Sequence, residues 1–406
     1  MRGVTIMKFG IGVGFVFALS AVHSVRPFLS QQSEAFKSYL PHLLNNRLMP
    51  LPSQWRMAFL SIYPADDRDS GGDVAEIYQM NGEGAGLEAL THLNSTILEF
   101  KWSPDGKKIA YSHHVATESG TQLAISVLDT ISGVSKTIMS NREFSDQVMW
   151  SPKGDAVAFV HHPFGYHASD KSDEHIIMIH DLASGQTLSL TSTITLFRGN
   201  SPSSISFVPD YLRPGETMFS YVTYSSENST QIGMIRDDDT LFQNGIEGSL
   251  PTWSPTYGKM AYVHTQCTSQ SCDSVLGILT FLDPSAPISI LIPSNLTLFP
   301  ISILNGYEIR QLAWSPTGSD LLIEVYRHPD VMIYRIKTDG SETKPQYVAS
   351  GQEPVWMPDS QGLFFAGFSA GNTANQIYAQ RFISGSSPIQ LTHFTNHLNI
   401  GLQVAP

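Results

Sequence analysis

Three histidines recur at one fixed distance from a tryptophan. His113, His161 and His264 each stand 11 residues after the Trp of a Trp-Ser-Pro sequence. Imidazole nitrogens bind divalent cations and exchange protons near neutral pH, so equivalent histidines could hold a metal ion or act as acid and base. No His-x-His spacing and no neighbouring carboxylate completes a ligand set. Ordinary packing at the ends of strands is the alternative, and we predict neither a metal site nor a cofactor.

Four polar residues recur at a second fixed position. They stand three residues before a Trp, and they are Glu99, Gln147, Gln311 and Glu353. Side chains at equivalent places in repeated elements point in the same direction, so this set could bind a polar ligand or a peptide. The alternative is that these residues are polar because they face water.

A literal match to the serine nucleophile motif Gly-x-Ser-x-Gly occurs at residues 367–371. That motif requires a strand before it, a helix after it, and a hydrolase domain of roughly 200 residues or more around it. No helical pattern follows Gly371, so we interpret the segment as a loop. The run Asp237-Asp238-Asp239 lacks the alternating spacing of a calcium loop and is interpreted as a solvated turn. We therefore predict no catalytic residue.

The tryptophans belong to a repeated hairpin. In residues 100–111, aromatic and β-branched residues flank Ser-Pro-Asp-Gly, where Pro fixes φ at the second turn position and Gly accepts a positive φ. The hairpin recurs at intervals of 42 to 61 residues, each of which has room for two further strands. This period is typical of a β-propeller with four-stranded blades, so we predict an all-β chain. The aromatic anchors, which we expect to pack between blades, are Trp102, Trp150, Phe207, Trp253, Trp314 and Trp356.

The number of blades depends on the two ends of the repeat region. Residues 57–60, 76–80 and 87–91 have the pattern of three strands, but no Trp-Ser-Pro turn precedes them. Residues 400–406 end in Val-Ala-Pro, where Trp-Ser-Pro stands elsewhere. Pairing this last strand with the first three would close the ring and remove an exposed edge. We predict seven blades with a split closing blade, and six blades as the alternative.

The motif Trp-Ser-Pro-Asp-Gly-Lys-Lys-Ile-Ala-Tyr, with a later Ile-Tyr strand and a Leu-Thr end, resembles the TolB-like (WD40-like, PD40) β-propeller family over residues 55–406. The family includes the periplasmic TolB of the Tol-Pal system, the propeller domains of prolyl oligopeptidase-type peptidases, and a few polysaccharide lyases. The resemblance implies the fold strongly and the function weakly. Its lyases hold a divalent cation with propeller histidines.

The composition and the N-terminus indicate an exported protein. The formal net charge of −12, without a basic run, argues against a nucleic-acid partner. Arg2 and Lys8 precede an apolar run over residues 9–22, shorter than the roughly 20 residues that span a bilayer. We therefore expect a signal peptide or membrane anchor over residues 1–24, a linker or short helix over 25–54, and the propeller over 55–406.

The two cysteines, Cys267 and Cys272, could close a small disulfide loop in an oxidising compartment, and two free thiols are the alternative.

These expectations lead to one functional hypothesis and one rival. The hypothesis is a non-enzymatic propeller in the periplasm or cell envelope, which binds an envelope protein or peptide or serves as a scaffold. A membrane tether through residues 9–22 is compatible with it. The rival is a propeller enzyme that acts on glycans, similar to a polysaccharide lyase, with a histidine metal site. The sequence does not determine the oligomeric state.

Overall fold

The computed structural model describes most of the chain after residue 50. The described residues are 51–64, 73–93, 95–118, 120–141, 144–162, 176–189, 205–207, 218–224, 230–236, 241–256, 258–267, 272–280, 295–299, 308–342, 344–368 and 374–406. The chain divides into two units, Met1–Leu51 and Pro52–Pro406. The predicted signal segment and most of the predicted linker lie outside the described residues.

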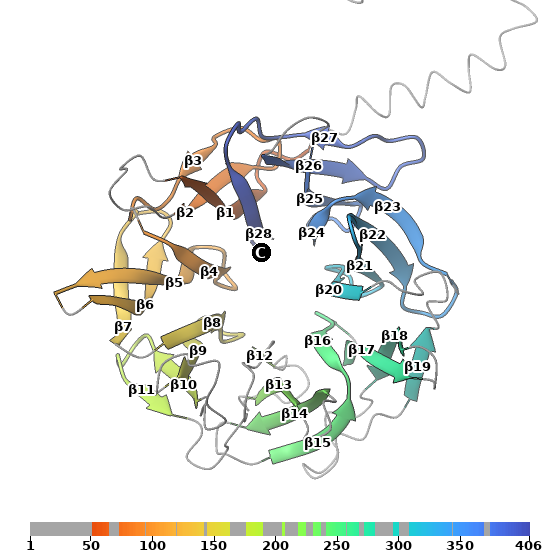
Figure 1. Cartoon of the computed structure of the whole chain (residues 1–406), viewed down its shortest axis with the longest axis horizontal. Helices are drawn as coiled ribbons and strands as arrows, with labels where there is room; N and C mark the ends of the chain where they lie inside the picture. Colours follow the sequence, from red (N-terminus) through yellow and green to blue (C-terminus); the bar gives the residue numbers. More distant parts are fainter. Residues whose placement is uncertain are drawn as a thin grey trace, which may run out of the picture. The chain divides into compact units, whose positions relative to one another are not determined.

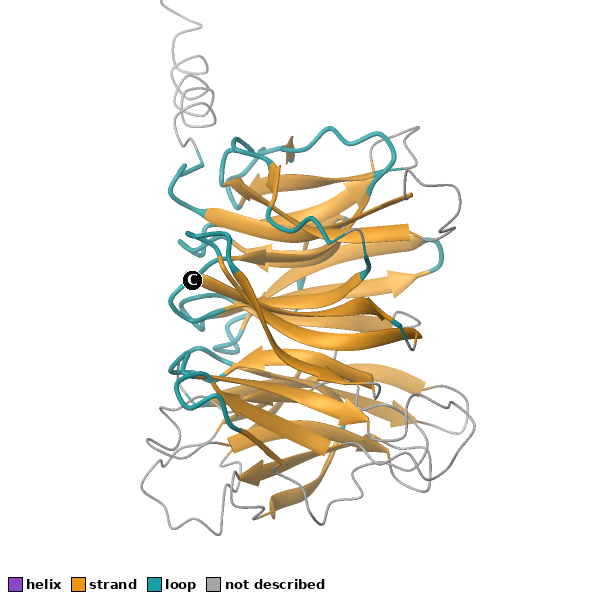
Figure 2. Cartoon of the chain, turned by 90° about the vertical axis from the view of Figure 1, so that its left-hand side faces the viewer, coloured by secondary structure: helices purple, strands orange, loops and turns teal. Residues whose placement is uncertain are grey.

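The second unit is a seven-bladed β-propeller, as predicted. Seven four-stranded antiparallel sheets surround a central channel (Figure 1). Figure 2 shows strands and loops throughout the described part. Within the described residues, no helix is long and apolar enough to cross a membrane.

In each blade the strands follow one another from the channel outwards. Blade 1 contains β28 (Leu398–Val404), β1 (Arg56–Pro64), β2 (Asp73–Asn81) and β3 (Glu88–Ala89); blade 2 contains β4 (Ile97–Trp102), β5 (Lys108–Thr117), β6 (Gly120–Asp129) and β7 (Ser135–Asn141); blade 3 contains β8 (Phe144–Trp150), β9 (Ala156–His162), β10 (Ile176–Asp181) and β11 (Thr187–Ser189). Blade 4 contains β12 (Ile205–Phe207), β13 (Met218–Tyr224), β14 (Thr230–Arg236) and β15 (Leu241–Glu247); blade 5 contains β16 (Ser249–Trp253), β17 (Lys259–Cys267), β18 (Cys272–Thr280) and β19 (Asn295–Phe299). Blade 6 contains β20 (Glu308–Trp314), β21 (Asp320–Arg327), β22 (Asp330–Lys337) and β23 (Gln346–Ser350); blade 7 contains β24 (Gln352–Trp356), β25 (Gly362–Phe368), β26 (Asn375–Arg381) and β27 (Ile389–Gln390).

Blade 1 is the split closing blade. Its innermost strand, β28, comes from the end of the chain and pairs antiparallel with β1, from Met57 opposite Val404 to Ile62 opposite Leu398. This pairing gives β1 a neighbour on its inner edge, which would otherwise expose unpaired backbone groups. The expected closure is confirmed, and the six-bladed alternative is excluded.

The Trp-Ser-Pro turn forms the hairpin between the first two strands of a blade. In blade 2, Ser103 N donates to Lys108 O at 2.8 Å, and Gly106 N donates to Ser103 O at 2.9 Å. Gly106 has φ 65°, a region that glycine enters without steric cost. In blade 7 the corresponding residue is Ser360, which has φ 59°. The same turn therefore forms with and without glycine.

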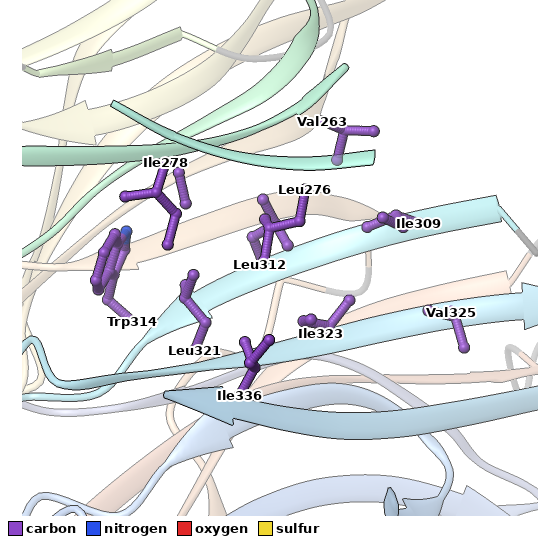
Figure 3. Close-up of a cluster of buried hydrophobic side chains, with 11 residues drawn as sticks. Val263, Leu276, Ile278, Ile309, Leu312, Trp314, Leu321, Ile323, Val325 and Ile336 are labelled. Carbon is purple, nitrogen blue, oxygen red and sulfur yellow. The ribbon is translucent and has the colours of Figure 1, made fainter. Parts of the chain in front are cut away.

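Neighbouring blades are joined by apolar packing, to which the motif tryptophan contributes in the blades that contain it. The indole Nε1 donates to a main-chain carbonyl of the preceding inner strand in three blades: Trp150 to Lys101 O at 2.9 Å, Trp314 to Thr252 O at 2.8 Å, and Trp356 to Ala313 O at 2.8 Å. Between blades 5 and 6, Trp314 packs with Leu321, Ile323 and other buried aliphatic side chains (Figure 3). The core is thus a series of interfaces between blades.

Candidate functional site

The central channel contains a cavity of about 980 Å³ on the side of the Trp-Ser-Pro turns. The inner strands of blades 5, 6, 7, 1 and 2 line it, and the prolines of the turns contribute to its wall. The lining residues are Lys101, Trp253, Pro255, Arg310, Gln311, Ala313, Trp314, Pro316, Glu324, Glu353, Pro354, Val355, Trp356, Pro358, Gly401, Leu402, Gln403, Val404, Ala405 and Pro406. Of the predicted binding residues, Gln311 and Glu353 line this cavity.

Several polar side chains of the cavity bind the backbone of the next blade. Glu353 of β24 accepts hydrogen bonds from Gly401 N and from Leu402 N, the latter at 3.2 Å. Gln403 of β28 donates through Nε2 to Phe100 O of β4 at 2.5 Å. These bonds join the inner strands of blades 7, 1 and 2.

Blade 6 is joined to blade 7 in the same way. Glu324 of β21 accepts a hydrogen bond from Glu353 N at 2.5 Å, and Gln311 of β20 donates to Pro354 O at 3.5 Å. Glu324 is 6% exposed and interrupts an apolar strand. A carboxylate within such a run is a sign of a buried polar contact, which sequence analysis could have used.

Burial controls the ionisation of the two glutamates. It raises the pKa of Glu324 and the pKa of Glu353, because each carboxylate loses water. The backbone donors partly oppose this effect, and so does a nearby cation in each case: Arg310 for Glu324 and Lys101 for Glu353. The net direction is upward for both groups, so the cavity disfavours a negative charge at these positions.

Two cationic residues of the cavity, Lys101 and Arg310, were not among the binding residues predicted from the sequence. Lys101 is exposed, and no hydrogen bond or ion pair joins its amino group to the described part of the chain. The Arg310 side chain is 41% exposed; its Cζ lies 3.5 Å from the Tyr326 ring centroid, and its Nη2 lies 3.6 Å from Glu308 Oε2. Both groups can reach a molecule in the cavity.

The two remaining polar residues of the predicted set lie outside the cavity lining. Glu99 of β4 accepts a hydrogen bond from Val148 N of blade 3, which repeats the bridge that Glu353 makes. Gln147 of β8 is half-buried and has φ 54°. The position three residues before the tryptophan therefore joins neighbouring inner strands in at least three blades.

An extra residue distorts the inner strands at this position. In β24 the register shifts between Gln352 and Val355, and Glu353 between them has φ 54°. Leu250 of β16 and Gly401 of β28 have φ 51° and 65° at the corresponding place. Such bulges re-aim side chains, and a positive φ in a non-glycine residue stores strain. The bulge is what turns these side chains towards the next blade.

The histidines lie within the blades. His113 is 6% exposed; its Nε2 lies 2.9 Å from Ser126 Oγ, and its ring centroid lies 4.9 Å from that of Tyr111. Burial lowers the pKa of His113 and so favours the neutral ring. His161 is 8% exposed. His264 is half-buried, with Nδ1 3.1 Å from Glu247 O.

No cluster of metal ligands unites these histidines. Among the residues that the structure describes, no three His, Cys, Asp or Glu side chains lie close enough together to hold a metal ion.

The other predicted features are placed only in part. Phe207 is the last residue of β12 and pairs with Phe219, but its side chain is outside the description.

Cys267 and Cys272 are opposite one another in the backbone register of β17 and β18. The disulfide stays a prediction, which mass measurement with and without thiol labelling would test. Ser369 and the Asp237–Asp239 run lie outside the described residues.

Comparison with solved structures identifies the fold. The propeller domain of the Trilobed protease from Pyrococcus furiosus is 13% identical, with 86% of this chain and 95% of that domain covered and a TM-score of 0.57. Oligogalacturonate lyase, solved with manganese, is 14% identical, with 84% of each chain covered and a TM-score of 0.50. TolB from Acinetobacter baumannii is 19% identical over 74% of this chain and 66% of that one, with a TM-score of 0.45.

The chain has the β-propeller fold of the Pyrococcus domain and of the lyase. No protein-family model matches it, and no curated protein matches it in sequence. The Pyrococcus domain has an open velcro topology, whereas β28 closes the ring of the present propeller. At these identities the likeness concerns the fold, and function must be argued from the site.

Proposed function

We propose that this chain is an exported, non-enzymatic propeller of the cell envelope, which binds an extended segment of a protein partner in its central channel. The observation that carries the proposal is the cavity of about 980 Å³, whose wall combines turn prolines with the accessible groups of Lys101 and Arg310. Concave, largely apolar sites with a few accessible polar groups are the usual binding sites of proteins.

The roles of the titratable residues favour binding over catalysis. Glu324 and Glu353 hold backbone N–H groups of neighbouring blades, and His113 is engaged with Ser126 inside blade 2. A general acid or base must reach a substrate, and these groups are occupied by the fold. Export is supported by the pattern of residues 1–24, and an envelope location is what the family resemblance of the Trp-Ser-Pro-Asp-Gly motif implies.

Selection of peptides on the immobilised full chain tests the proposal. Random peptides of about ten residues are suitable, since they extend over roughly 30 Å. Val355 lines the cavity, and Val355→Trp would obstruct it. Ile131, 78% exposed in the turn between β6 and β7 of blade 2, provides the control Ile131→Trp. We expect the affinity of selected peptides to fall at least about tenfold with Val355→Trp and to be unchanged with Ile131→Trp.

Two results would overturn the proposal. One is that no selected peptide is sensitive to Val355→Trp in a protein with an unchanged circular dichroism spectrum. The other is stoichiometric binding of Mn²⁺, measured by calorimetry, that is lost with His161→Ala. The second result would favour the glycan enzyme with a histidine metal site.

A further inference from the structure

The cationic side chains of the cavity are accessible, whereas its carboxylates contact the backbone of neighbouring blades. The chain as a whole has a formal charge of −12, yet the carboxylates of Glu324 and Glu353 face backbone donors of the neighbouring blade. Lys101 and Arg310 are the charged lining residues whose ends are accessible. Glu308, which lies beside Arg310, is 65% exposed and is not among the lining residues. Among the side chains that line the cavity, the accessible charge is therefore mainly positive.

The two cations belong to opposite sides of the channel. Lys101 is in β4 and Arg310 is in β20, and Figure 1 shows these strands facing each other across the ring. Stacking on Tyr326 restricts the guanidinium of Arg310, which reduces the entropy lost when it binds a carboxylate through two hydrogen bonds. A chain that passes along the channel would meet one cation on each side.

The aromatic residues of the cavity favour a peptide over a sugar chain. Sugars bind on exposed faces of aromatic rings, but the lining tryptophans Trp253, Trp314 and Trp356 are only 5–8% exposed, because they pack between blades. The turn prolines provide apolar surface without a ring face for stacking. We infer that the channel selects a peptide segment with acidic side chains, which Lys101 and Arg310 bind from opposite sides. This inference rests on the proposed function of the channel.

The test uses two peptide libraries of about ten residues, identical except at two fixed positions that carry Glu in one library and Gln in the other. On the unchanged full chain we expect the Glu library to yield binders roughly tenfold tighter, with an advantage that added salt reduces. Lys101→Glu and Arg310→Glu should each abolish this advantage. Arg310→Lys should retain part of it, because the charge remains. Lys136, exposed on the outer strand β7 of the same blade as Lys101, provides the control Lys136→Glu, which should leave the advantage unchanged.

The outcomes separate this inference from the proposed function. If both libraries yield equally tight binders that Val355→Trp weakens, the channel binds peptides but does not select acidic ones, and the inference is wrong. If neither library yields binders sensitive to Val355→Trp, the proposed function fails. Trigalacturonate is the third probe. If it binds and Lys101→Glu removes that binding, the carboxylate ligand is a glycan and the peptide assignment is overturned.

Discussion

The interface between blades 5 and 6 differs in kind from the closing region around β28. Between blades 5 and 6, buried aliphatic residues such as Leu321 and Ile323 pack against the neighbouring sheet, and Trp314 adds one hydrogen bond to Thr252 O (Figure 3). Both sheets come from one continuous stretch of the chain, residues 249–350, so these blades are neighbours in sequence. Apolar packing is sufficient there.

The closing region relies on buried polar contacts. Asn375 of β26 donates to Asn399 O at 2.7 Å and accepts from Asn399 N at 2.6 Å. The Asn399 side chain accepts from Ser61 Oγ of β1 at 2.8 Å, and all three residues are 0% exposed. Glu353 adds its bonds to Gly401 N and Leu402 N of the same strand.

The difference shows what each kind of contact provides. The strand β28 must find its place beside β1 without a short connection, and a slip of one residue would exchange its buried and exposed faces. Apolar contacts tolerate small shifts, whereas a buried amide pair is satisfied in one register only. We conclude that packing stabilises the interface between blades 5 and 6 and that the polar network fixes the register of the closing strand.

Removal of residues 398–406 should have the largest effect. The deletion exposes the inner edge of β1 and removes the buried side chains of Asn399 and Leu402. We expect Tm to fall by more than about 10 °C, with aggregation through the exposed edge, as measured by circular dichroism and light scattering. An unchanged Tm would show that the closing strand contributes nothing to stability, and would contradict the role assigned to its polar contacts.

A pair of single substitutions tests the two kinds of interface directly. Asn375→Ala leaves the buried N–H and C=O of Asn399 unsatisfied, at a cost of about 2–4 kcal/mol. Leu321→Ala removes a side chain that is 0% exposed between blades 5 and 6, at a cost of about 2–5 kcal/mol.

Hydrogen exchange distinguishes the two variants where Tm does not. With Asn375→Ala we expect faster exchange confined to β28 and β1, since the register of the closing strand is loosened. With Leu321→Ala we expect faster exchange in blades 5 and 6 only. Equal exchange patterns in the two variants would contradict a separate role for the polar network.

The pH dependence of stability tests the half-buried carboxyl of Glu353. Burial raises the pKa of Glu353 in the folded state above the unfolded value of 4.5. Its contribution to stability is therefore fully present below that unfolded value and is lost as pH rises through the folded pKa. Blades 3 and 6 have a glutamine at the position of Glu353, namely Gln147 and Gln311. Glu353→Gln should therefore retain the hydrogen-bond acceptor without the charge.

We expect Tm of Glu353→Gln, relative to the unchanged protein, to be higher at about pH 8 than at about pH 4, because only the ionised carboxylate is penalised by burial. Thermal melts in a series of buffers of equal ionic strength measure this difference. Glu308→Gln, at an exposed carboxyl of the same channel region, is the control. A difference that falls as pH rises would contradict the upward shift.

The fold could be predicted because it depends on local chemistry that is repeated. Pro104 and Gly106 specify a turn by their own φ preferences, and the repeat of Trp102 at blade spacing requires neighbouring sheets. The terminal Val404-Ala405-Pro406 matched the same place in the motif, which located the closing strand. Each of these signals is contained in a segment of a few residues, so it can be recognised without knowledge of the tertiary structure.

The lining of the cavity could be predicted only in part. In a regular strand, Arg310 and Ala313 would point to opposite faces, because their separation is odd. The bulge between Ile309 and Gln311 breaks that alternation, and both residues line the cavity. The sequence contains no local signal for a bulge at a non-glycine residue, so Arg310 was missed.

The smallest expected effect concerns the turn of blade 7. Ser360 has φ 59° where glycine stands in other blades, and its Oγ is buried without a hydrogen-bond partner among the described residues. Ser360→Gly removes both costs, and we expect a gain of about 0.5–1 kcal/mol, seen as a small rise in Tm. The reverse change, Gly318→Ser at φ 70° in blade 6, should lower Tm by a similar amount. If Ser360→Gly lowers Tm, the hydroxyl makes a contact that outweighs the strain, and the turn of blade 7 differs from the others in more than its residue type.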